Sequence, residues 1–114
     1  MASTLDIRSR SLPGEALVIE LAGTLDAHTG QQFAAALAEA EAAPVTRIVI
    51  DLARLEFIAS AGIGALIACR HRLAAQGRSL RLAAASPGVA DVFAILGLDA
   101  LLPMHAHVVD ALGR

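Results

Sequence analysis

The chain has 114 residues and a formal net charge of −2, with 56% hydrophobic but only 3% aromatic residues. This length fits one compact domain, and the hydrophobic content excludes a disordered chain. All nine basic residues are arginine and are spread along the chain without a basic run, which excludes nucleic acid as an expected partner.

The first half of the chain predicts a β-hairpin, a helix and a buried strand. Apolar and charged residues alternate from Leu5, as in a half-buried strand, and residues 16–22 form a second apolar run that Gly23 ends. Turn residues at 11–14 separate the two runs, as in a hairpin. A helical pattern then begins near Thr29 and is closed by a proline, and residues 46–52 form a β-branched run typical of a central strand.

The second half predicts three helical segments that alternate with short strands. We expect helices over about 61–76, 88–96 and 108–112, and strands over 80–84 and 101–105. Strand–helix–strand order implies parallel pairing with right-handed crossovers. The fold class is therefore α/β: a single domain over residues 1–114. It has a mixed sheet of about four to five strands with an N-terminal hairpin, and three to four helices packed mainly on one face.

Several features of the chain predict a cytoplasmic protein. The single cysteine, Cys69, cannot form an internal disulfide, which fits a reducing compartment. The N-terminal residues lack the apolar segment of a secretory signal. No window reaches the ~18 uninterrupted apolar residues of a membrane span, so we expect no direct insertion into a membrane.

The stretch FIASAGIGAL, residues 57–66, places a serine where an apolar run turns into a helix. Backbone N–H groups at a helix start lack partners, and the helix dipole there favours an anion. Ser60 has two interpretations: a plain N-cap worth ~1 kcal/mol, or a phosphorylated switch. The small neighbours Ala59, Ala61 and Gly62 leave room for a phosphate.

A second polar loop, residues 23–29, follows the second predicted strand. Its acid, Asp26, could cap the helix that comes next. Loops that follow parallel strands gather at one edge of a sheet, so Asp26 and Ser60 could also be neighbours.

The helix after Ser60 predicts a contact surface. Winding it at 100° per residue places four residues on a core stripe: Gly62, Leu66, Cys69 and Leu73. Ile63, Ile67 and Arg70 then fall on a flank about 100° away. This flank either binds another protein or is covered by a second element of the same domain.

Catalytic and metal sites are weakly supported. A nucleophile elbow needs glycine two residues before the serine, where this chain has Ile58, and no motif places a base beside Ser60. Ser60, Asp99 and His105 follow the chain order of a hydrolase triad. The chain is too short for that fold, however, and this spacing is common by chance. His105 and His107 are two ligands, which is too few for a zinc site. We expect neither an enzyme nor a cofactor or metal.

Three ordered motifs together resemble the STAS-domain family. FIASAGIGAL after the strand 46–52 resembles the family's core motif, in which a serine is followed by a small residue and glycine. GTLD at 23–26 resembles its G-E-L-D loop. The segment from Ser-Pro at 86–87 to Gly-Leu at 97–98 resembles its third motif. The resemblance extends from about residue 5 to residue 110.

The resemblance implies a bacterial anti-sigma factor antagonist that regulates transcription by partner switching. The unphosphorylated protein would bind an anti-sigma factor that is also a serine kinase. Phosphorylation would release it, and a metal-dependent serine phosphatase would reverse the step. Ser60 matches the phospho-acceptor position, and Asp26 matches the loop acid near it.

The chain departs from the family pattern on both sides of Ser60. Ala59 stands where an acid is common, and Ala61 stands where serine or threonine is common. The first departure favours an alternative: a STAS module without phosphorylation, acting as a scaffold, a sensor or an accessory subunit of a lipid transporter. The identity of the sigma factor and the oligomeric state stay open.

Overall fold

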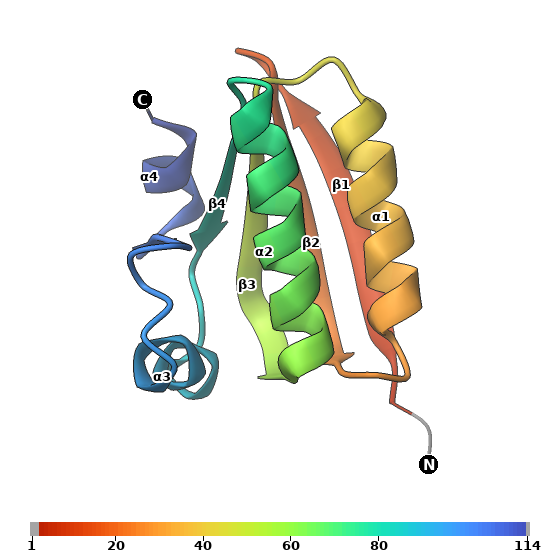
Figure 1. Ribbon diagram of the computed structural model, residues 1–114, viewed down its shortest axis with the longest axis vertical. Coiled ribbons are helices and arrows are strands. Elements are labelled where there is room, and N and C mark those ends of the chain that lie inside the picture. The colour runs from red at the N-terminus through yellow and green to blue at the C-terminus, as the bar shows by residue number, and fades with distance from the viewer. Residues whose placement is uncertain (1–2, 114) are drawn as a thin grey trace.

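A mixed β-sheet runs through the computed structural model, which describes residues 3–113 (Figure 1). Its strand order follows the chain, β1-β2-β3-β4-β5. The first pair is antiparallel and every later pair is parallel. The predicted hairpin and mixed sheet are therefore confirmed. The strands are β1 (Leu5–Leu12), β2 (Ala16–Leu25), β3 (Arg47–Ile58), β4 (Ser79–Ala83) and β5 (Met104–His105).

Three of the four helices in residues 3–113 share one core. The helices are α1 (Gly30–Ala42), α2 (Ser60–Ala75), α3 (Pro87–Ile95) and α4 (Val108–Leu112). α1 and α2 lie side by side over the sheet (Figure 1), and α3 contributes Val89 and Phe93 to the same buried cluster. Helix α4 packs Ala111 against Val18 and Val49 in a separate cluster. Packing mainly on one face is thus confirmed, with α4 as the exception.

Alternation along the central strands separates the two faces of the sheet. Every second residue from Leu17 in β2, and from Ile48 to Leu52 in β3, points into the main core, while Val18 and Val49 point to the other side. Leucine and isoleucine fill this core. No helix in residues 3–113 has the length and apolar character that crossing a bilayer requires.

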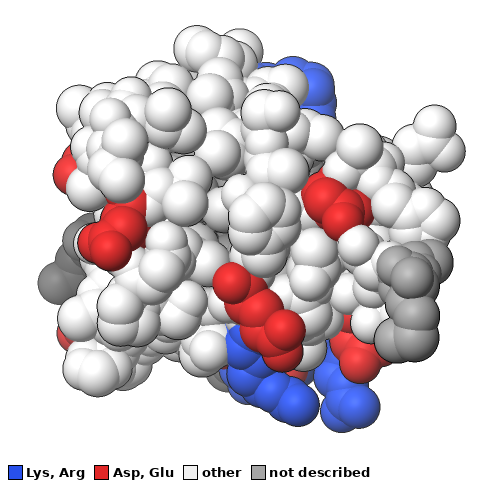
Figure 2. Space-filling model, turned by 90° about the horizontal axis from the view of Figure 1, so that it is seen from below, with Lys and Arg blue, Asp and Glu red and all other residues white. Residues whose placement is uncertain are grey.

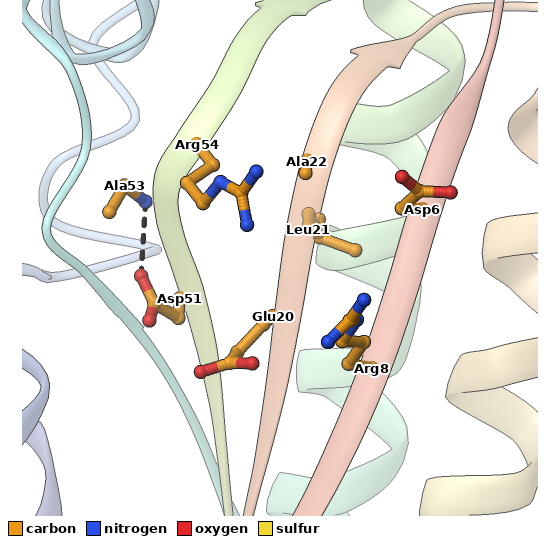
Figure 3. Close-up of a pocket in the computed structure, with 8 residues that line it drawn as sticks. All are labelled: Asp6, Arg8, Glu20, Leu21, Ala22, Asp51, Ala53 and Arg54. Atoms are coloured by element: carbon orange, nitrogen blue, oxygen red, sulfur yellow. Dashed lines mark hydrogen bonds between the residues drawn. The ribbon is translucent and has the colours of Figure 1, made fainter.

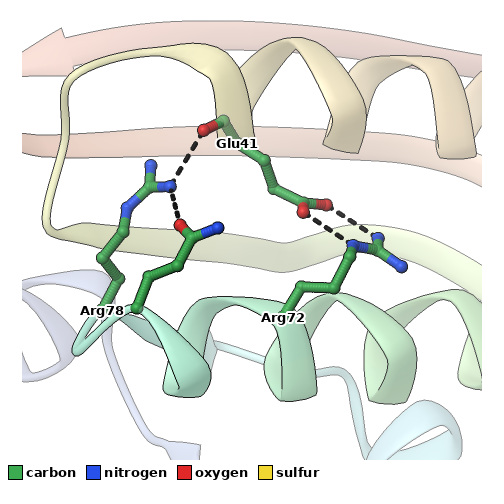
Figure 4. A network of polar contacts seen from close by, with 4 residues as sticks. Glu41, Arg72 and Arg78 are labelled. Atoms are coloured by element: carbon green, nitrogen blue, oxygen red, sulfur yellow. Dashed lines mark hydrogen bonds and ion pairs between the residues drawn. The ribbon is translucent and has the colours of Figure 1, made fainter.

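Polar contacts join α1 and α2 at the end remote from Ser60 (Figure 4). Arg72 binds the Glu41 carboxylate through two nitrogens at 2.7 and 2.8 Å. Arg78 donates to the backbone carbonyls of Glu41, Ala43 and Val45 at 2.7–3.0 Å. These bonds hold the C-terminal ends of both helices together. The N-terminal ends, including Ser60, lie at the opposite edge of the sheet.

Strands β2 and β3 are longer than the sequence predicts. Gly23 does not end β2, because the strand continues through it to Leu25. Its φ is +114°, and an added Cβ would lie 2.4 Å from the carbonyl oxygen of Thr4. The glycine therefore permits close approach of β1 instead of stopping the strand. As a result, β2 and β3 run on together as far as the two polar loops.

At Gly62, helix α2 packs closely against the sheet. A Cβ at this position would lie 2.5 Å from Leu25 Cγ and 3.2 Å from Ile58 Cγ1. Leu25 is fully buried and Ile58 is 3% exposed, so neither can move aside freely.

We expect Gly62→Ala to lower the free energy of unfolding by about 1–3 kcal/mol, because the methyl group overpacks this contact. Gly64→Ala is the matched control in the same helix, since its Cβ would meet nothing within 4 Å. It should instead raise the free energy of unfolding by up to ~1 kcal/mol. Urea denaturation measures both, and a Gly62→Ala protein as stable as Gly64→Ala would contradict the packing.

Candidate functional site

The loop after β2 (residues 26–29) and the turn from β3 into α2 at Ala59 and Ser60, called the Ser60 loop below, meet at the carboxyl edge of the sheet. Leu25 and Ile58, the last residues of β2 and β3, are paired in the parallel ladder. One residue later, the Ala59 N–H donates to the Leu25 carbonyl at 2.8 Å. Asp26 and Ser60 each follow a residue of this hydrogen bond. The structure therefore brings the two loops together, as parallel pairing predicts.

Asp26 organises its own loop. Its Oδ1 accepts hydrogen bonds from the N–H groups of His28 and Thr29 at 2.9 and 3.1 Å. Its Oδ2 accepts from the hydroxyl of Ser3, which precedes β1. The buried Thr29 hydroxyl donates to the Thr24 carbonyl at 2.8 Å. The N-cap of α1 is Thr29, so Asp26 orders the chain before the helix and does not cap it directly.

These contacts also fix the charge of Asp26. The hydrogen bond from Ser3 holds the pKa of the Asp26 carboxyl below its ordinary value, and the N–H groups of Thr29 and His28 act in the same direction. Partial desolvation opposes them. Hydrogen bonds to a carboxylate favour its ionised form, so the loop carries a fixed negative charge at neutral pH.

Ser60 is the first residue of α2, and Ala59 is its N-cap. Of the two interpretations of Ser60, the plain N-cap is therefore wrong. The Ala59 backbone is extended, with φ −106° and ψ 173°, and alanine offers no side-chain cap. Ser60 is exposed, and its hydroxyl has no hydrogen-bond partner among residues 3–113. A free hydroxyl thus stands at a helix start whose N–H groups have no side-chain acceptor.

The immediate neighbours leave this hydroxyl accessible. Ala61 is exposed, Ala59 is half-buried, and Gly62 is buried against the sheet. Figure 2 views the molecule from this edge and shows a largely uncharged surface. Acidic side chains stand apart on it, and the visible arginines lie at its margins.

The predicted contact flank of α2 is only partly open. Ile63 is 7% exposed and belongs to the main core, so the prediction that it lies off the core face is wrong. The apolar face of a helix in a globular domain is wider than the narrow stripe assumed from the sequence, and here it includes Ile63. Ile67 and Arg70 are half-buried, and their contact with a partner stays a prediction.

The periodicity of the sequence missed the exposed large apolar side chains, which among the described residues are those of Phe57, Ile95, Leu96 and Val109. Phe57, three residues before Ser60, is 52% exposed, while Ile95 and Leu96 at the end of α3 are 83% and 57% exposed. Phe57 faces outward because the pairing of β2 with β3 shifts between Gly23 and Thr24. The available signal was an aromatic residue beside Ser60 in a chain that has only three phenylalanines.

The chemistry of the described residues gives little support to catalysis. Burial raises the pKa of the Cys69 thiol to about 12, so this cysteine is neutral and unreactive. His105 lies in β5 and His107 is the N-cap of α4. Within residues 3–113 no three His, Cys, Asp or Glu side chains are grouped as metal ligands would be.

Comparisons with known proteins identify one family. A family model described as "Mlab, STAS domain" matches residues 9–103. The anti-sigma F factor antagonist of Paenibacillus polymyxa is 27% identical over 97 residues, which cover 84% of this chain and 83% of the relative.

Solved structures are similar over nearly their whole length. An anti-sigma factor antagonist from Mycobacterium paratuberculosis superposes with a TM-score of 0.88 at 25% identity, covering 96% of this chain and 92% of that one. The antagonist SpoIIAA in its unphosphorylated form has a TM-score of 0.78 at 31% identity, with 93% and 92% covered. Its phosphorylated form, from Bacillus, has a TM-score of 0.71 at 30% identity, with 93% and 96% covered.

The lowered pKa of Asp26 predicts how the loop responds to acid. A carboxyl group whose pKa is depressed on folding adds stability above its unfolded pKa, and this stability is lost as the pH falls through the folded pKa. We expect the Asp26 carboxyl carbon, followed by NMR, to titrate below the ordinary value near 3.9. Ser3→Ala should move the midpoint upward, because it removes the strongest hydrogen bond. An unchanged midpoint in Ser3→Ala would contradict this account.

Proposed function

This chain belongs to the STAS-domain family, and we propose that it is an anti-sigma factor antagonist whose partner binding is switched by phosphorylation of Ser60. The observation that carries the proposal is the exposed Ser60 hydroxyl at the start of α2, which has no hydrogen-bond partner in the described part of the chain. The family match over most of the chain supports it, as do the solved antagonists that share the fold. The function is one of binding and regulation, and Ser60 acts as a substrate, not as a nucleophile.

Phosphorylation changes this edge of the molecule through charge. A phosphate on Ser60 adds about −1.5 to −2 charges and three strong acceptors. The first-turn N–H groups of α2, which no side chain caps, suit those acceptors. The ionised Asp26 in the adjacent loop adds like charge at the same edge. The edge therefore changes from largely uncharged to strongly acidic without any rearrangement of the fold.

This change is sufficient to release a partner. In the unphosphorylated state the partner contacts the Ser60 loop together with Phe57, Ile67 and Arg70. Burying a phosphate dianion against an apolar or acidic surface costs desolvation and repulsion. A shift of only a few kcal/mol separates a mostly bound from a mostly free protein.

The proposed partner is an anti-sigma factor with serine-kinase activity. Binding would free a sigma factor for transcription in the cytoplasm, and phosphorylation of Ser60 would reverse that effect. A metal-dependent serine phosphatase would restore the binding form. The names of the related antagonists support the first of these partners. The kinase and phosphatase steps follow from the family resemblance and the accessibility of Ser60.

A second candidate function is a STAS module with a constitutive partner, as a scaffold, a sensor or an accessory subunit of a lipid transporter. The observation that favours it is Ala59. An acid at this N-cap could accept the first-turn N–H groups and contact a kinase, and alanine does neither. This candidate predicts that Ser60→Asp leaves partner binding unchanged.

We expect incubation with ATP and an extract of the native cell to add one phosphate to the protein. Ser60→Ala should abolish this incorporation, as measured by intact mass. Ser86→Ala is the matched control, because Ser86 stands at the start of α3 and its hydroxyl donates to the Leu55 carbonyl at 3.4 Å. Full incorporation into Ser60→Ala would overturn the assignment, and loss in Ser86→Ala alone would move the site to α3.

A further inference from the structure

The sheet face opposite α1 and α2 contains a small polar cavity (Figure 3). Its volume is about 170 Å³, and residues of β1, β2 and β3 line it. Helix α4 covers this face only around Val18, Val49 and Ala83, so the cavity lies on the part that α4 leaves open. It is separate from the Ser60 edge, where the proposed partner binds.

A β-bulge in β3 shapes the cavity. Glu20 pairs with Asp51, but Ala22 pairs with Arg54, so that β3 has one residue more than β2 between these pairs. Leu52 and Leu55 both point into the core, and the two residues between them are both exposed. The bulge therefore turns Arg54 onto the open face, which is a common role of bulges beside binding sites.

Strand register then sets a diagonal arrangement of charge. One row across the sheet reads Asp6, Ala22, Arg54, and the next reads Arg8, Glu20, Asp51. The two arginines thus occupy one diagonal of the cavity, and Asp6 and Asp51 occupy the other. Ala22 lies between Asp6 and Arg54, and its small side chain leaves the middle of the cavity hollow, as the labelled side chains in Figure 3 show.

The arginines of this cavity are not neutralised by the fold. Glu20 pairs with Arg10 at 3.4 Å, and Asp51 accepts the Ala53 N–H at 3.0 Å. Within residues 3–113, no carboxylate lies within 4.0 Å of the guanidinium of Arg8 or Arg54. Arginine forks of this kind bind a carboxylate through paired hydrogen bonds.

We propose that this cavity binds a compact zwitterion of the α-amino acid class. The ligand carboxylate lies between Arg8 and Arg54, and its ammonium group points toward one end of the other diagonal, Asp6 or Asp51. A simple anion would meet the carboxylates uncompensated, and a simple cation would meet the guanidinium groups. A cavity of this volume fits a ligand much smaller than a drug-sized molecule, because pockets for drug-sized ligands measure about 300–1,000 Å³.

The test is an NMR titration of the ¹⁵N-labelled full chain with glycine, L-alanine and L-serine. Acetate and methylammonium at equal ionic strength are the single-charge probes. We expect saturable shifts of the Ala22 and Ala53 amides with at least one amino acid, and at least tenfold weaker binding of either single-charge probe. Arg54→Gln should weaken amino-acid binding about tenfold or more, because it removes a charge-assisted hydrogen bond.

Two further variants separate binding from folding. Ala22→Leu fills the hollow without removing a charge and should abolish the shifts while leaving the thermal unfolding curve in place. Arg72→Gln, which removes an arginine from α2 outside the cavity, should bind as the wild type does. The proposal fails if no amino acid gives a saturable shift below ~10 mM. It also fails if acetate binds as tightly as the amino acids, or if Arg72→Gln weakens binding as much as Arg54→Gln.

Discussion

The parallel pairing of β2 with β3 up to their last residues is the constraint on which this site depends. The bond from the Ala59 N–H to the Leu25 carbonyl continues the pairing one residue past the ladder. Gly62 allows the first turn of α2 to pack directly on Leu25 and Ile58. The position of Ser60 is therefore fixed by the sheet, and a charge added there acts on a preformed edge and not on a mobile loop.

Two loops with different tasks share this edge. The Asp26 loop is held by hydrogen bonds to Ser3, His28 and Thr29, so its negative charge has a defined place. The N-cap before Ser60 is extended and offers no side-chain acceptor, and the Ser60 hydroxyl has no hydrogen-bond partner among residues 3–113. An ordered acid beside a free hydroxyl suits a switch that works by electrostatics. Regulation of this kind requires no second conformation of the domain, only a partner surface that tolerates the uncharged edge.

Much of this arrangement could be predicted from the sequence, because it depends on local patterns. Alternation in the hairpin, the β-branched strand and the strand–helix order define the sheet, and three motifs indicate the family. The rest depends on contacts between strands that periodicity does not record. Bulges between β2 and β3 expose Phe57 and turn Arg54 onto the open face. Ile63 is buried because the apolar face of α2 is wider than predicted. Ala59, and not Ser60, is the N-cap because the helix begins one residue earlier than predicted.

The central claim is that phosphate on Ser60 and partner binding exclude each other, and the phosphorylation state of bound and free protein tests it most directly. The tagged chain would be captured from its native cell, separated into partner-bound and free fractions, and analysed at Ser60 by mass spectrometry. The account predicts phosphate in the free fraction and unmodified Ser60 in the bound fraction. Equal phosphate occupancy in both fractions, or no phosphate under any growth condition, would contradict it.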